Sequence, residues 1–140
     1  MIDIIGTLRH IKQRVDNLFA MVNAILTLTE TGGTVTTTGP GTEDVIYINA
    51  APAGVFEPAV VQIDFTNQTA AETVVVRVYY RINPTVVAMV LKDEVAFVGL
   101  QDPELKNVDL EPNRFGVQVT IENTAGGPAI AYDWAVFKRD

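Results

Sequence analysis

Hydrophobic residues recur along the first thirty residues at alternating spacings of four and three, the period of a helix in a coiled coil. The seam consists of Ile4, Leu8, Ile11, Val15, Leu18, Val22 and Ile25. In heptad notation, Leu8, Val15 and Val22 take position a, and the other four take position d. The pattern predicts a helix over residues 1–30 that ends at Thr31-Gly32-Gly33 and uses these seven residues as an oligomer interface.

The identity of the seam residues bears on how many helices associate. Isoleucine fills three of the four d positions, a choice that disfavours a parallel dimer and favours three or more strands. Ile5, Phe19 and Leu26 at e, with Met21 and Leu28 at g, widen the apolar stripe. We therefore expect a homo-oligomer, with a trimer favoured. A single amphipathic helix packed on its own β-domain would produce the same stripe, so both interpretations stay open.

From residue 44 onward the hydrophobic period changes from 3.5 to 2, which is typical of half-buried strands. Turn-forming residues such as Asn83-Pro84 and Asp102-Pro103 interrupt the alternation at short intervals. The predicted strands are 44–50, 58–66, 72–82, 86–91, 95–100, 105–110, 114–123 and 129–138. Eight short strands without intervening helices predict an all-β antiparallel sandwich of the jelly-roll type.

The organisation expected from these patterns has three parts. Residues 1–30 form the helical oligomerisation stem, and residues 44–140 form the β-sandwich. Between them, residues 31–43 are rich in threonine and glycine and form an extended connector or an edge strand that ends in a turn.

One stretch is apolar on both faces of its predicted strands. Residues 86–91 carry apolar side chains at every position and residues 95–100 at every position but Gly99, and Lys92-Asp93-Glu94 between them is interpreted as a hairpin tip. A strand that is apolar on both sides must be covered on both sides. The cover is either the rest of the domain or a second subunit, and in the latter case Val87, Met89 and Leu91 extend the oligomer interface.

Composition removes most classes of enzyme. The chain contains no cysteine, no serine and one histidine, so it has no thiolate metal site, no Ser-His-Asp triad and no histidine-built metal centre. No glycine-rich phosphate loop is present. We therefore expect a non-enzymatic protein with no catalytic residues, no cofactor, no metal and no small-molecule substrate.

Charge and hydropathy limit the partners. The net charge is −7 at pH 7, and residues 31–140 carry all of it, which disfavours nucleic acid as a partner. No apolar run approaches the roughly 20 residues that a membrane-spanning helix needs, so no membrane partner is expected.

The order of these elements resembles small virion proteins of tailed bacteriophages and archaeal viruses. A heptad helix over Ile4–Leu28 precedes a Thr/Gly connector and an acidic β-domain from Asp44 to Lys138. Head-fibre, decoration and spike subunits of such particles combine a trimerising coiled coil with a β-rich head. The resemblance implies a virion location and contacts with other virion proteins, and it transfers no functional residue to this chain.

Two other functions fit the same sequence. An extracellular carbohydrate-binding or adhesion module would use Arg77, Tyr79 and Arg81, which share the polar face of one predicted strand. A pilus or surface-filament subunit would place its N-terminal helix in the filament core. That helix should be more continuously apolar than one that carries Arg9, Lys12, Arg14 and Asp16.

Overall fold

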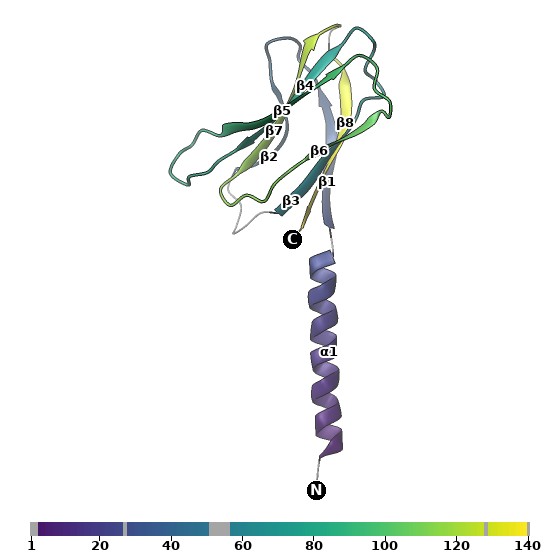
Figure 1. Cartoon of the computed structure of the whole chain (residues 1–140), viewed down its shortest axis with the longest axis vertical. Coiled ribbons are helices and arrows are strands. Elements are labelled where there is room, and N and C mark those ends of the chain that lie inside the picture. Colours follow the sequence, from purple (N-terminus) through teal and green to yellow (C-terminus); the bar gives the residue numbers. More distant parts are fainter. Residues whose placement is uncertain (1–2, 27, 51–56, 128, 140) are drawn as a thin grey trace.

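A computed structural model describes residues 3–26, 28–50, 57–127 and 129–139, and its description of side chains leaves out residues 21–29, 57 and 139. It contains one helix, α1 (Ile4–Leu26), followed only by strands (Figure 1). The strands are β1 (Leu28–Thr36), β2 (Asp44–Asn49), β3 (Glu57–Asp64), β4 (Thr73–Tyr80), β5 (Val90–Val98), β6 (Leu105–Asp109), β7 (Val117–Ala125) and β8 (Ala131–Arg139).

The strands form two antiparallel sheets of four. Sheet A has the order β1-β8-β3-β6, and sheet B has the order β2-β7-β4-β5. Four pairs join the strands that lie symmetrically about the middle of this series: β1 with β8, β2 with β7, β3 with β6 and β4 with β5. The predicted all-β antiparallel sandwich is confirmed at this level.

The core lies between the two sheets and is built by period-2 alternation. Val61 and Val136 project from sheet A, Val76 and Ile121 project from sheet B, and all four are buried in one apolar cluster. Phe65 links this cluster to Phe97 and Tyr132, with ring centroids 4.6 and 5.4 Å away respectively. The fully buried side chains belong to the strands and to the β3–β4 connection, so the sandwich has a core of its own to which the described part of α1 contributes nothing.

Asp3 begins α1. Its side-chain Oδ1 accepts a hydrogen bond from Gly6 N at 2.9 Å, and its carbonyl oxygen accepts one from Thr7 N at 3.1 Å. This N-cap satisfies amide groups that a helix start leaves unpaired and contributes about 1 kcal/mol. It offsets a similar cost of glycine within the first turn.

The end of the helix differs from the expectation. α1 ends at Leu26, and Thr31-Gly32-Gly33 lies inside β1, which pairs with β8 along its whole length. The glycines serve close approach here and not a helix cap. A Cβ at position 32 would come within 2.8 Å of the Trp134 carbonyl oxygen, and one at position 33 would lie 3.4 Å from the Trp134 indole ring. The connector expected over 31–43 is therefore an edge strand as far as Thr36.

The segment 86–100 also differs from the expectation. Two strands joined by a hairpin tip were predicted, but a single strand, β5, pairs with β4 from Val90 to Val98. Lys92, Asp93 and Glu94 thus lie within a strand, because a bulge opposite Val78 and Tyr79 accommodates one extra residue. Residues 81–89 form the connection between β4 and β5.

Tyr132 allows a test of the core. Burial, reinforced by the nearby Glu72 carboxylate, raises the pKa of Tyr132 to about 12, so its phenol stays neutral in the folded chain. Its hydroxyl donates to no group among the described residues. Stability from this neutral state is present below the ordinary pKa of 10 and is lost as pH rises through 12.

We predict that Tyr132→Phe leaves the free energy of unfolding at pH 7 unchanged or raises it by up to about 1 kcal/mol. The variant should also lose less stability than the parent between pH 10 and 12. Denaturant titrations at pH 7 and above pH 10 measure both effects. The matched control is Tyr80→Phe, which leaves Glu111 N without the Tyr80 hydroxyl that it contacts at 2.7 Å and should cost about 1 kcal/mol. A large loss of stability in Tyr132→Phe at pH 7 would contradict this account.

Candidate assembly surfaces

The apolar stripe of α1 faces solvent. Among the predicted seam residues, Ile4, Leu8, Ile11, Val15 and Leu18 are all exposed, as are the flanking residues Ile5 and Phe19. Val22 and Ile25 lie in α1, but their side chains are outside the described set. From Asp3 to Ala20 every residue is exposed except Gly6, which is half-buried.

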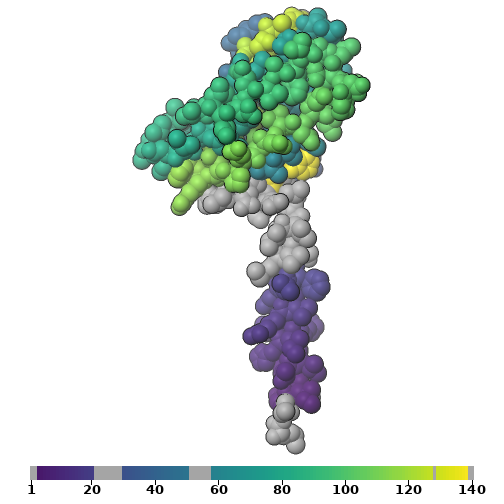
Figure 2. Space-filling view, viewed as in Figure 1, coloured from purple at the N-terminus to yellow at the C-terminus, as the bar shows by residue number. Residues whose placement is uncertain are grey.

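This exposure differs from what a helix packed on its own β-domain would show. The stalk formed by the first part of α1 stands clear of the sandwich (Figures 1 and 2). An amphipathic helix packed on its own β-domain would have buried its apolar face, and residues 4–20 do not. Within one chain the seam therefore has no cover over this stretch.

One ion pair on α1 begins beside the seam. Lys12 Nζ lies 2.6 Å from Asp16 Oδ2, one helical turn further along. Such an exposed pair contributes only a few tenths of a kcal/mol. In the heptad, Lys12 takes position e beside the seam and Asp16 takes position b on the outer side, so the pair turns the lysine away from the seam.

The second predicted interface lies on the β4–β5 connection and the start of β5. Val87 is 86% exposed and Leu91 is exposed, whereas Met89 is half-buried. Ile82, Val86 and Val90 are further exposed aliphatic residues in the same segment. Five exposed aliphatic side chains within ten residues are unusual for a surface loop and mark it as a candidate contact.

The backbone of this connection is held in place by Arg81. Its Nη1 donates to the Ala50 carbonyl at 2.9 Å, and its Nη2 donates to the Val87 carbonyl at 3.0 Å. Asn83 Oδ1 accepts hydrogen bonds from both the amide and the hydroxyl of Thr85, which closes a tight turn. The aliphatic side chains are thus presented from a fixed backbone.

A further pair of exposed aliphatic residues, Val45 and Ile48, lies on β2 at the opposite edge of sheet B. The hydrophobic pattern alone does not single them out. The register of β2 against β7 shifts between Val45 and Tyr47, and buried Ile46 lies at the shift. A bulge breaks the strict alternation that would have identified the outward positions.

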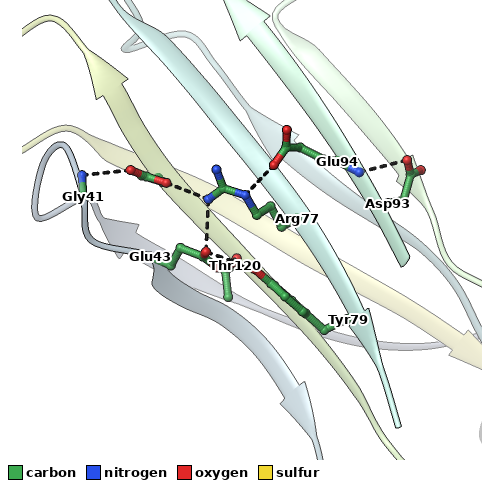
Figure 3. A network of polar contacts seen from close by, with 8 residues as sticks. Gly41, Glu43, Arg77, Tyr79, Asp93, Glu94 and Thr120 are labelled. Carbon is green, nitrogen blue, oxygen red and sulfur yellow. Dashed lines mark hydrogen bonds and ion pairs between the residues drawn. The ribbon is translucent and has the colours of Figure 1, made fainter. Parts of the chain in front are cut away.

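Between these two edges, the outer face of sheet B carries a polar network centred on Arg77 (Figure 3). Arg77 Nη1 lies 2.6 Å from Glu122 on β7, and Nε lies 2.6 Å from Glu94 on β5. Nη1 is also 3.2 Å from Glu43, which precedes β2. One guanidinium therefore links β4, β5 and β7 and the residue that immediately precedes β2.

The partners of Arg77 are themselves anchored. The Glu43 carboxylate accepts hydrogen bonds from the hydroxyls of Tyr79 and Thr120, each at 2.7 Å, and the Glu122 carboxylate accepts one from Gly41 N at 2.8 Å. The hydrogen bond to Arg77 is the main reason that the pKa of Glu122 is lowered, and the same contact raises the pKa of Arg77. The side chains of Arg77 and Glu122 are only 17% and 12% exposed.

The residues proposed for carbohydrate binding are already engaged in contacts within the chain. The structure brings Arg77 and Tyr79 together, but it pairs both with glutamates, and it commits Arg81 to backbone carbonyls. Sequence reasoning missed the glutamates, because Glu94 was assigned to a turn. Only the strand register shows that Glu94 lies directly opposite Arg77.

Two other classes of site receive no support within the part of the chain that the structure describes. No cluster of three or more His, Cys, Asp or Glu side chains there could hold a metal ion. α1, the one helix in that part, does not combine the length and the apolar character needed to cross a membrane.

Comparisons with known proteins give only a distant structural likeness. No protein-family model matches the chain, and no curated protein matches it. A solved structure described by the words "Bacillus endospore appendages form a novel family of disulfide-linked pili" superposes with a TM-score of 0.47 at 12% sequence identity. The alignment covers 81% of this chain and 88% of that one.

The Arg77 network predicts how the stability of two variants depends on pH. The lowered pKa of Glu122 means that its contribution to stability is present above its ordinary value of 4.5 and is lost as pH falls through the lowered value. Glu122→Gln should lose about 1–2 kcal/mol at pH 7 and should show a flatter acid limb than the parent.

Arg77→Met should lose about 2–3 kcal/mol at pH 7, because three glutamates then face one another without a cation. Its stability should rise relative to that of the parent as pH falls from 7 toward 4, because the hydrogen bond from Arg77 is the main cause of the lowered pKa of Glu122. Denaturant unfolding of the parent and both variants from pH 4 to 7 measures these slopes. If the free energy of unfolding changes with pH equally in all three proteins, the Arg77 network contributes no pH-dependent stability.

Proposed function

We propose that this chain is a non-enzymatic structural protein that acts as a homo-oligomer, with α1 as a coiled-coil stem and the β-sandwich as a head. The observation that carries the proposal is the uncovered seam of α1, whose described members from Ile4 to Leu18 are all exposed. Each buried aliphatic side chain contributes about 2 kcal/mol, so covering the seam with identical helices is a large gain for every chain.

A trimer is the stoichiometry that the seam supports best. Isoleucine at d disfavours two-stranded packing, and exposed Ile5 and Phe19 beside the seam supply more apolar width than one partner helix covers. Asp16, at position b on the outer side, then remains in water and holds the Lys12 ammonium at the rim of the seam.

The head supports a structural role. Nested pairing of β1 with β8, β2 with β7, β3 with β6 and β4 with β5 is the strand arrangement of a jelly roll. We infer that the head has this topology and that the oligomer is a virion component of the decoration, head-fibre or spike type. Its partners are then other virion proteins, and its location is the virion, with the extracellular surface as the alternative.

A surface-filament subunit is the second candidate. It is favoured by the exposed aliphatic residues on both β2 and the β5 side of sheet B, which are different patches on opposite edges. Contacts between two different patches close into a ring or continue as an open filament, depending on the rotation between copies. The size of the assembly distinguishes the two candidates.

The stem predicts a specific effect of one seam substitution. Ile11→Asp places a carboxylate from every chain at the centre of the bundle, where burial of unpaired charge is strongly unfavourable. We expect the dissociation constant of the oligomer to rise at least about 100-fold, and light scattering on the full-length chain measures the mass.

The matched control is Gln13→Asp, which adds the same charge on the outer face of α1 and should leave the mass unchanged. The thermal unfolding of the sandwich should be the same in both variants, because the described core does not involve α1. If Ile11→Asp keeps the parent's oligomeric mass, or if the parent is a monomer, the proposal fails.

A further inference from the structure

The exposed aliphatic residues of the head have an uneven distribution. In the part of the head that the structure describes, the large exposed hydrophobic residues are Val45, Ile48, Ile82, Val86, Val87, Val90, Leu91, Val98, Leu100 and Leu105. All but Leu105 lie on β2, on β5 or in the segments that adjoin β5. β2 and β5 are the two edge strands of sheet B. Of the edge strands of sheet A, β1 and β6, only β6 carries one of these exposed residues, Leu105.

The middle of sheet B is unlike its edges. There the outer face carries the Arg77 network, in which one cation is bound by three glutamates (Figure 3). A partner lying flat on this face would have to desolvate that network and would cover few apolar groups. A partner that meets the sheet at an edge covers the aliphatic residues and reaches only the outermost glutamates of the network, Glu94 on β5 and Glu43 beside β2.

We propose that the β5 edge of one head, together with residues 81–89, packs against the β2 edge of a second copy of this chain. The proposal rests on the proposed function, because the stem brings identical heads together. In a ring of three or more copies, adjacent copies meet through two different patches, and sheet B offers two apolar patches at opposite edges.

The topology of sheet B fits this contact. Four strands alternate in direction from β2 to β5, so β2 and β5 are antiparallel to each other. When a second copy lies edge to edge with its strands in the same directions, its β2 follows β5 with the alternation intact. An odd number of strands would have broken this alternation.

The register identifies the side chains that would meet. Ile48 lies opposite Gln118, Gln118 lies opposite Tyr79, and Tyr79 lies opposite Leu91, so these residues form one row across the sheet. Ile48 and Leu91 are the exposed ends of that row. The proposed contact brings these two ends together, with Leu91 of one copy beside Ile48 of the next.

The contact is made by side chains and does not continue the hydrogen-bonded ladder of the sheet. A register shift interrupts β2 between Val45 and Tyr47, and another interrupts β5 beside Lys92. Lys92, Asp93 and Glu94 also place charges in the middle of the β5 edge, a common protection against strand pairing. The aliphatic residues flank these charges on both sides.

Crosslinking of single-cysteine chains tests the contact, because the natural sequence contains no cysteine. Full-length Ile48→Cys and Leu91→Cys are co-refolded, treated with a short bis-maleimide and analysed by denaturing electrophoresis, with light scattering on the same samples. We expect an efficient crosslink in the mixture and little in either variant alone. The double variant should give a ladder that stops at three chains in a closed trimer and continues in a filament.

The matched control pair is Thr34→Cys with Leu105→Cys, which occupies the corresponding ends of a row across sheet A and should crosslink poorly. If the mixture fails to crosslink while light scattering shows an oligomer, the edge contact is wrong and the stem proposal stands. The edge contact is also wrong if Leu91→Cys crosslinks efficiently to itself, or if the control pair crosslinks equally well. A monomeric mass overturns the stem proposal and, with it, the edge contact.

Discussion

The constraint on which the assembly depends is an apolar seam that a single chain leaves in water. Five seam residues between Ile4 and Leu18 are exposed on a helix that stands apart from its own domain. The hydrophobic effect acts on area and has no preferred partner, so the seam needs only a complementary surface of the same period. The nearest such surface is the seam of another copy.

In the proposed oligomer, folding and assembly belong to different parts of the chain. The sandwich buries its own core, with Val61, Ile63, Val117 and Tyr132 removed from solvent altogether. The described part of α1 buries almost nothing and has an N-cap at Asp3 for local support. Because most helical stability in proteins comes from packing of an apolar face, the proposed association of α1 would also stabilise the helix. The Arg77 network adds a third role, since it ties β4, β5 and β7 to the residue that precedes β2 and keeps the middle of the outer face of sheet B polar.

The hydrophobic period of the sequence predicts the helix and several strands. The prediction fails where one residue type suits two different structures. The spacing of the seam predicted α1, and alternation predicted β3, β4 and β7 to within a few residues. β1 was ambiguous because Gly32-Gly33 is equally suited to a helix cap and to close packing beneath Trp134. β5 was divided because Lys92-Asp93-Glu94 has the composition of a turn, yet it pairs with β4 inside a strand. The glutamates around Arg77 could not be assigned, because their proximity depends on the register of four strands that are distant in sequence.

The central claim is that α1 assembles the full-length chain, and sedimentation equilibrium over a range of concentrations tests it most directly. The account predicts a species of three times the 15.2 kDa chain mass, which dissociates only on strong dilution. A mass of 15.2 kDa at every concentration would contradict it.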